Sequence, residues 1–260
     1  MRIVVCVKYV PDLQSERSLD SDGHLVRGLD DAINELDENA VEAAVALAEV
    51  EQAEVIALTV GPGDAVDAVR RALQMGVDSG VHVCDERVAG ADVVGTAKVL
   101  AAAIRTIERS GPIDLVVTGM ATMDGLTSML PAALAALLDR PALTLASRIG
   151  HLEGDALTIT RSIGEAEEEQ TARLPALVSV TDQLNEPRIP GAMSLMSARK
   201  KPVETWLLDD LDGGTDLGEL TGTAVVTAEP RPLREAGRIL NDTGDGGRRL
   251  AAYLVENKLV

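Results

Sequence analysis

The stretch EVIALTVGPGDAVDAVRRALQM, residues 54–75, decides the fold class of this chain. After Glu54 its first part is almost wholly apolar, which is typical of a β-strand buried on both faces. The Gly61–Pro62 break ends that strand, and we expect a helix from Asp64 to Met75. A buried strand that leads at once into a helix is the repeating unit of a parallel α/β sheet.

The same unit recurs on both sides of this stretch. Buried-type strands are expected at residues 2–7 (RIVVCV), 81–84 (VHVC), 114–119 (DLVVTG) and 176–180 (ALVSV), and helices at about 38–51, 92–108 and 130–138. This alternation predicts an α/β fold with a doubly wound, mostly parallel sheet.

Two segments depart from the pattern. Residues 144–162, TLASRIGHLEGDALTITRS, alternate around a Glu-Gly-Asp turn and predict a hairpin added to the sheet, whereas the acidic Glu167–Glu169 stretch is expected in a solvated loop. Beyond Lys201 the chain is acidic, rich in glycine and aperiodic, with one terminal helix expected over residues 248–258. We therefore expect an α/β domain over residues 1–203 and a C-terminal arm over residues 204–260.

Composition excludes several classes of function. The formal net charge of −18 repels nucleic acid and anionic lipid, and a chain with no Phe, one Trp and two Tyr offers few rings for base stacking. Cys6 and Cys84 are too few for a disulfide framework, and the three histidines are too scattered for a metal site. No apolar run has membrane-spanning length and no signal peptide is expected, so we predict a cytoplasmic protein without membrane insertion.

The candidate ligand-binding residues lie in the loops that follow the strands, because α/β sheets bind ligands beyond the carboxyl ends of their strands. These loops are residues 7–13, 59–63 and 119–128, and the last, GMATMDGLTS, offers glycines, hydroxyls and a helix N-terminus suited to a phosphate. The alternative is a plain helix cap at Thr127 or Ser128. There is no Walker or GxGxxG motif and no catalytic constellation, which favours a carrier or a regulatory module.

A second candidate is residues 174–201, LPALVSVTDQLNEPRIPGAMSLMSARKK, which we call the docking segment. A buried strand is followed by a polar turn, a Pro- and Gly-bearing loop with methionines, and a basic run. Methionine adapts to several partner surfaces, so the segment predicts docking to other proteins.

These pieces together resemble the beta subunit of electron transfer flavoproteins, from Arg2 to about Val203. The resemblance rests on the order and spacing of VVCVKYVPD, INELDENAVEAA, VIALTVGP, RRALQMGVDSGVHV, LVVTGMATMDG, LPALVSVTDQLNEPR and MSARKK. It implies the adenine-nucleotide-binding sheet that this family shares with universal stress proteins. It also implies a heterodimer with an alpha subunit that holds most of the FAD, and a structural AMP in this chain.

Carried over by position, the resemblance implies an AMP pocket and one residue near the flavin. The pocket residues would be Cys6, Asn34, Glu35, Leu36, Asp37, Val60, Gly119, Met120, Ala121, Thr122, Met123, Asp124, Gly125, Thr127 and Ser128. Leu13 would approach the flavin at the subunit interface, where the family often has an aromatic ring.

The docking segment would then contain the loop that recognises flavin dehydrogenases, from which electrons pass to an acceptor of the quinone oxidoreductase type. Its recognition residues would be Arg188, Pro190, Gly191, Ala192, Met193, Ser194, Leu195, Met196, Arg199 and Lys200. The C-terminal arm would wrap the alpha subunit. Three positions depart from the family: Ala192 replaces an anchoring Leu, Ser162 a carboxylate and Met129 a common Gln.

Two alternatives stay open. One is a bifurcating flavoprotein, in which a second FAD replaces AMP and NADH is a donor. The other is a stand-alone adenine-nucleotide module of the universal-stress kind, which would form a homodimer without an alpha subunit.

Overall fold

The computed structural model describes two compact units, Met1–Val226 and Thr227–Val260. The description covers the whole chain except Glu16, Asp22, Leu29, Pro230, Arg231, residues 233–236, Arg238, Leu240 and the side chain of Thr215.

The first unit is built on a seven-stranded sheet in which every adjacent pair is parallel. Its order is β12 (Val203–Trp206), β5 (Ser79–Val83), β4 (Glu54–Val60), β1 (Arg2–Cys6), β6 (Leu115–Gly119), β11 (Ala176–Val180) and β7 (Ala142–Ala146). The predicted doubly wound, parallel α/β class is confirmed.

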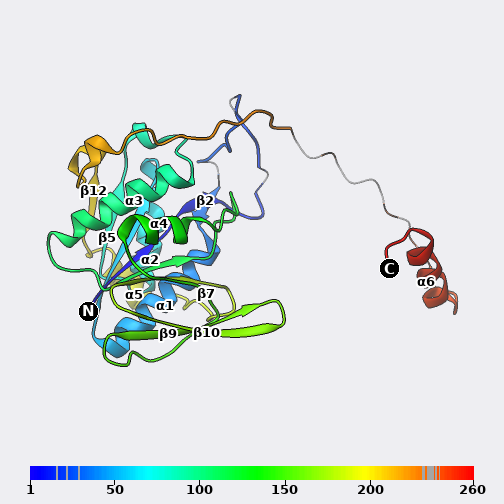
Figure 1. Ribbon diagram of the computed structural model, residues 1–260. Coiled ribbons are helices and arrows are strands. Elements are labelled where there is room, and N and C mark those ends of the chain that lie inside the picture. The colour runs from blue at the N-terminus through cyan, green and yellow to red at the C-terminus, as the bar shows by residue number, and fades with distance from the viewer. Residues whose placement is uncertain are drawn as a thin grey trace. The chain divides into compact units, whose positions relative to one another are not determined.

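Helices cover both faces of this sheet (Figure 1). One face carries α1 (Glu35–Glu51), α2 (Val66–Met75) and the short α5 (Ala192–Ala198), and the other carries α3 (Val93–Glu108) and α4 (Leu130–Leu138). Ile3 and Val5 of β1 join the core on the α1 side, whereas Val4 and Cys6 join the core on the α3 side. Burial on both faces is the reason that the strands are apolar without alternation.

The strand order reverses at the centre of the sheet. From β1 the chain first builds outward through β4 and β5, and it then returns to place β6 on the opposite side of β1. The loops that follow β1 and β6 therefore diverge at the carboxyl edge, which is where sheets of this kind bind ligands.

Antiparallel strands lie outside the main sheet. They are the pair β2 (Tyr9–Pro11) and β3 (Asp31–Ile33), and a three-stranded sheet of β8 (Arg148–Ile149), β9 (Ala156–Ile163) and β10 (Ala166–Arg173). The hairpin predicted around the Glu-Gly-Asp turn is present as β8 paired with β9, although residues 144–146 belong to β7 of the main sheet, and β10 adds a longer pairing to β9. The expectation of a loop at Glu167–Glu169 is wrong, because these residues lie on β10, where Glu168 pairs with Arg161 of β9.

Residues beyond Val203 also belong to the first unit. They form β12 and the short turns η3 (Leu208–Asp210) and η4 (Gly214–Asp216), with Leu208 and Leu211 buried. Two further short helical turns are η1 (Gly63–Ala65) and η2 (Glu86–Val88). The compact unit thus runs to Val226, past the domain boundary expected at Val203, because leucines in the Gly-rich stretch pack on the α3 side of the core.

The second unit contains the helix α6 (Gly246–Glu256), which agrees with the terminal helix expected from the sequence. Within the described part of the chain, no helix combines the length and the apolar character needed to cross a bilayer.

Candidate functional site

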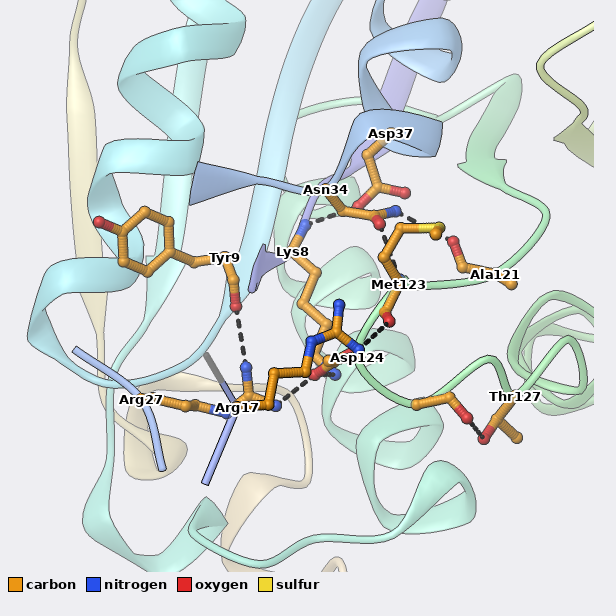
Figure 2. A network of polar contacts seen from close by, with 11 residues as sticks. Lys8, Tyr9, Arg17, Arg27, Asn34, Asp37, Ala121, Met123, Asp124 and Thr127 are labelled. Carbon is orange, nitrogen blue, oxygen red and sulfur yellow. Dashed lines mark hydrogen bonds and ion pairs between the residues drawn. The ribbon is translucent and has the colours of Figure 1, made fainter. Parts of the chain in front are cut away.

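Asn34, at the start of α1, organises the loop that follows β6. Its side chain is fully buried, and its Nδ2 donates a hydrogen bond to the carbonyl oxygen of Ala121 at 3.0 Å. Its Oδ1 accepts one from the backbone N–H of Met123, also at 3.0 Å. One amide therefore sets the shape of the predicted nucleotide loop from within (Figure 2).

Asp37, in the first turn of α1, joins the ends of β1 and β6. Its Oδ2 accepts the backbone N–H of Lys8 at 2.8 Å, and it also accepts a backbone hydrogen bond from Gly119. A Cβ atom at Gly119 would lie only 2.5 Å from Oδ1 of Asp37 and 2.9 Å from the carbonyl oxygen of Leu36, so this approach requires glycine. Burial raises the pKa of Asp37 to about 7, although these hydrogen bonds oppose the rise.

Asp124 forms ion pairs with two basic side chains at the same edge of the sheet (Figure 2). Its side chain is 2% exposed, and Oδ2 lies 2.8 Å from Nζ of Lys8 and binds the guanidinium of Arg27 as well. Arg17 donates to the carbonyl oxygen of Met123 at 3.0 Å. Burial acts to raise the pKa of Asp124, but Lys8 and Arg27 outweigh it and hold that pKa below its usual range.

Sequence reasoning missed the three basic residues of this network. Lys8 could have been found, since it directly follows the first strand at the ligand-binding edge. Arg17 and Arg27 lie in a polar loop that carries no motif, and only the fold brings them to the loop after β6.

Two buried hydroxyls at the same edge have no hydrogen-bond partner among the residues that the structure describes: Thr118 near the end of β6 and Thr59 near the end of β4. A buried polar group without a partner costs about 1–3 kcal/mol, so each is a natural contact for a polar ligand. Cys6, at the end of β1, is also buried, and burial raises the pKa of its thiol to about 12. The residues present therefore suit a neutral heterocycle with polar edges and a phosphate held beside Lys8 and Arg27.

The remaining predicted pocket residues divide into two groups. Met120, Ala121, Thr122, Met123 and Gly125 share the Asn34-supported loop, and Glu35 and Leu36 open α1 beside it. Val60 ends β4 next to β1, and Leu13 lies half-exposed after β2; neither takes part in the polar network of the described residues.

The helix-cap alternative for Thr127 and Ser128 is wrong. Met129 is the N-cap of α4, and no side chain of the described residues caps that helix. The hydroxyl of Thr127 donates to the carbonyl oxygen of Gly125 at 3.2 Å. Thr127 and Ser128 are exposed, which leaves both hydroxyls at the surface of the loop.

The docking segment differs from the flexible loop that we expected, because residues 192–198 form α5. Ile189, Met193 and Met196 are 91%, 86% and 70% exposed, and Leu195 is 41% exposed. We call these four residues the apolar patch. Pro190, Gly191, Ala192 and Ser194 lie between them in the segment, and Arg199 and Lys200 follow as exposed residues.

Two basic residues of the docking segment have structural partners. Lys201 Nζ donates to the carbonyl oxygens of Leu73, Gly76 and Val77 at 3.2, 3.2 and 2.6 Å, so it closes the C-terminal end of α2. Arg188, which we expected among the recognition residues, binds Glu42 and Glu49 of α1.

The sequence of this chain matches known proteins along almost its whole length. Residues 23–211 match the family model described as the electron transfer flavoprotein domain. Curated relatives include an electron transfer flavoprotein subunit beta from Mycobacterium leprae, 39% identical over 99% of each chain, and one from Mycobacterium tuberculosis, 38% identical over 99% of each chain. A subunit of the caffeyl-CoA reductase–Etf complex of Acetobacterium woodii is 30% identical over 94% of this chain and 93% of its own.

Proposed function

The chain belongs to the beta-subunit family of electron transfer flavoproteins, and on that premise we propose that it is half of a heterodimeric electron carrier. In this proposal it holds AMP in a structural role, helps to enclose an FAD carried mainly by an alpha subunit, and docks flavin dehydrogenases. Electrons then pass to an acceptor of the quinone oxidoreductase type, and the chain is not a self-contained catalyst. The cytoplasmic location expected from the sequence stays a prediction.

The proposal that the chain binds AMP rests on the hydrogen bonds by which Asn34 and Asp37 hold together the segments that follow β1 and β6. These hydrogen bonds hold the loop after β6 in one shape. Lys8 and Arg27 pair with Asp124 of that loop, and within the described part of the chain the hydroxyl of Thr118 has no hydrogen-bond partner. Preorganised backbone and nearby cations are what a nucleotide monophosphate needs. These contacts support AMP as the ligand.

The proposal that this chain helps to enclose FAD rests on its membership of the family. When bound, FAD supplies the electron-transfer chemistry, and the protein orients it and excludes water. Of this chain's own residues, Leu13 offers a half-exposed apolar side chain on the loop after β2, which would pack against such a ring system.

The docking part is supported by the apolar patch. Large apolar side chains with such exposed fractions, grouped within eight residues, mark a protein-interaction site. Ala192 lies at the start of α5, and the neighbouring methionines would replace the anchoring Leu of other family members.

The test is to co-express this chain with its alpha subunit, purify the heterodimer and count the nucleotides released on denaturation. We expect about one FAD and one AMP for each heterodimer. Two FAD and no AMP would instead favour the bifurcating type, a second candidate because one relative is named as part of a caffeyl-CoA reductase–Etf complex. A stable homodimer of this chain alone that binds ATP would contradict the proposal and favour the stand-alone module.

A further inference from the structure

We propose that Arg188 is a positioning residue for docking, because it holds the base of the docking segment on α1 and so sets where the apolar patch is presented. The inference rests on the proposed function, in which that patch contacts a flavin dehydrogenase. Arg188 itself acts through the patch and does not need to touch the partner.

The first observation is the set of contacts that Arg188 makes with two carboxylates of α1. Nε lies 2.7 Å from Oε2 of Glu42, Nη2 lies 3.0 Å from Oε1 of Glu42, and Nη1 lies 2.7 Å from Oε1 of Glu49. The backbone N–H of Arg188 also donates to Glu42, at 3.0 Å. Glu42 thus binds both the backbone and the side chain of one residue, which fixes its position and its direction.

Only arginine can make this arrangement. Glu42 and Glu49 lie seven residues apart, on one face of α1 and two turns from each other. The planar guanidinium presents a fork of donors that spans both carboxylates, whereas an ammonium group is a compact point charge.

A second contact lies one turn earlier on the same helix. Nδ2 of Asn39 donates to the carbonyl oxygen of Asn185 at 2.9 Å and to its Oδ1 at 3.0 Å, and Nδ2 of Asn185 donates to the carbonyl oxygen of Asn39 at 3.1 Å. The docking segment therefore follows α1 from Asn185 to Arg188. Immediately after Arg188 comes Ile189, the most exposed residue of the patch.

The far end of the patch is held as well, because Lys201 binds the C-terminal end of α2. Between these two supports, α5 has seven residues, of which only Ala198 is buried. Such a short helix has little stability of its own, so its direction depends on its packing against α2 through Ala198 and on how its two ends are held. Releasing the Arg188 end would let the patch adopt many orientations, and docking would have to overcome that conformational entropy.

Arg188 is separable from the stability of the fold. The side chain of Arg188 is 33% exposed and that of Glu49 is 61% exposed, so this pair lies at the surface; Glu42 is 14% exposed, but it keeps the backbone N–H of Arg188 as a donor when the guanidinium is removed. Its removal should therefore affect docking far more than unfolding. Asn34 directly precedes the same α1 and Asp37 lies in its first turn, so one helix supports both the nucleotide loop and the docking segment.

The test compares Arg188→Ala with Arg71→Ala in the purified heterodimer. Arg71, on α2, is a matched control, since it pairs with Glu38 of α1 at 2.7 Å and makes no ion pair with the docking segment in the described part of the chain. The substrate is the flavin dehydrogenase that reduces the unmodified heterodimer fastest in a panel. Arg188→Ala should raise the KM for that dehydrogenase about tenfold with kcat nearly unchanged, Arg188→Lys should give an intermediate KM, and Arg71→Ala should change neither.

A label reports the position of the patch without any partner. A nitroxide at Met193→Cys, in a Cys84→Ser background that leaves only the buried Cys6, should become more mobile with Arg188→Ala and not with Arg71→Ala. In a Met193→Glu background, where docking through the apolar patch is already impaired, Arg188→Ala should raise KM much less than it does in the unmodified heterodimer. The milder Glu49→Gln, which removes one charge of the clamp, should shift the KM in the same direction.

Three results would overturn the inference: an unchanged KM, additive effects of Arg188→Ala and Met193→Glu, or a KM rise accompanied by a larger loss of nucleotide or melting temperature than in Arg71→Ala. If Arg188→Ala has no effect while Met193→Glu slows reduction, the inference fails and the docking proposal stands. If Met193→Glu also has no effect, the docking proposal itself fails.

Discussion

Lys8 places its Nζ atom 2.8 Å from Oδ2 of Asp124, although 116 positions separate the two residues in the chain. Lys8 follows β1 and Asp124 lies in the loop after β6, so their ion pair closes the edge where the strand order reverses. Arg27 binds the same oxygen from the polar loop between β2 and β3. One buried carboxylate thus joins three segments of the candidate nucleotide site.

Asp124→Asn should destabilise the protein, because Lys8 and Arg27 lose their shared counter-charge. We expect a loss of about 1–3 kcal/mol in the free energy of unfolding near pH 7, measured by urea titration. The folded pKa of Asp124 is lowered, so its stabilisation is present above the ordinary aspartate pKa and is lost as the pH falls below it. The gap between the wild type and the variant should therefore close in acid.

The control is Asp67→Asn, which removes an exposed carboxylate paired with Arg70. Equal losses in the two variants, or a gap that stays constant down to pH 3, would count against a special role for Asp124.

Gly119→Ala should destabilise the junction of β1, β6 and α1. The new methyl group would meet Oδ1 of Asp37 at 2.5 Å and the carbonyl oxygen of Leu36 at 2.9 Å, so the first turn of α1 must shift. Overpacking of this kind costs about 1–3 kcal/mol, and a lower AMP content of the heterodimer should accompany it. Gly63→Ala is the control, because a Cβ atom there meets nothing within 4 Å; similar losses in both variants would refute the steric argument.

Asp37 should make stability depend on pH near neutrality. Its folded pKa of about 7 lies above the ordinary value of 3.8, so between these values the folded protein binds more protons than the unfolded chain. Stability from this group is therefore lost as the pH rises towards 7, by on the order of 1 kcal/mol per pH unit. Asp37→Asn should lack this slope in urea titrations from pH 5 to pH 8, while the exposed Asp64→Asn should keep it. Parallel profiles for Asp37→Asn and the wild type would contradict the assignment.

Met193→Glu and Met196→Glu should slow reduction of the heterodimer by its dehydrogenase partner. Each places a charge at the centre of the apolar patch, which would be desolvated on docking, and a slowing of about tenfold or more is expected. Stopped-flow measurement of flavin reduction checks the rate, and the bound FAD should be unchanged. Val50→Glu alters an exposed apolar residue near the end of α1, outside the docking segment, and serves as the control. Undiminished electron transfer to every physiological partner would rule out this docking site.

Truncation after Val226 should weaken assembly with the alpha subunit. It removes the second compact unit, in which α6 has no buried residue although Leu250 and Val255 are apolar. We infer that another protein covers this helix. The truncated heterodimer should therefore dissociate at protein concentrations at least about tenfold higher than the full-length heterodimer does, as measured by size-exclusion chromatography. Truncation after Glu256, which spares α6, is the control. Unchanged assembly after the longer truncation would show that the arm does not wrap the alpha subunit.

Much of the fold could be predicted because its strands are buried on both faces and its helices are regular. The expected boundaries of β11 and α4 match the structure residue for residue. The strand β10 was missed, since its exposed glutamates are typical of a loop, and only its antiparallel pairing with β9 along its whole length makes it a strand. The helix α5 was missed as well, because Pro190 and Gly191 just before it suggest a flexible loop.

The sequence alone determined the class of sheet, the family and the two regions where ligand and partner are expected. These properties follow from local periodicity and from the order of short motifs, which can be read along the chain. Only the tertiary structure decided that Lys8 and Arg27 share Asp124, and that Arg188 faces α1 instead of a partner. The reason is physical: a charged side chain in a loop can pair with many others, and the strand order and the course of each loop select which one it reaches.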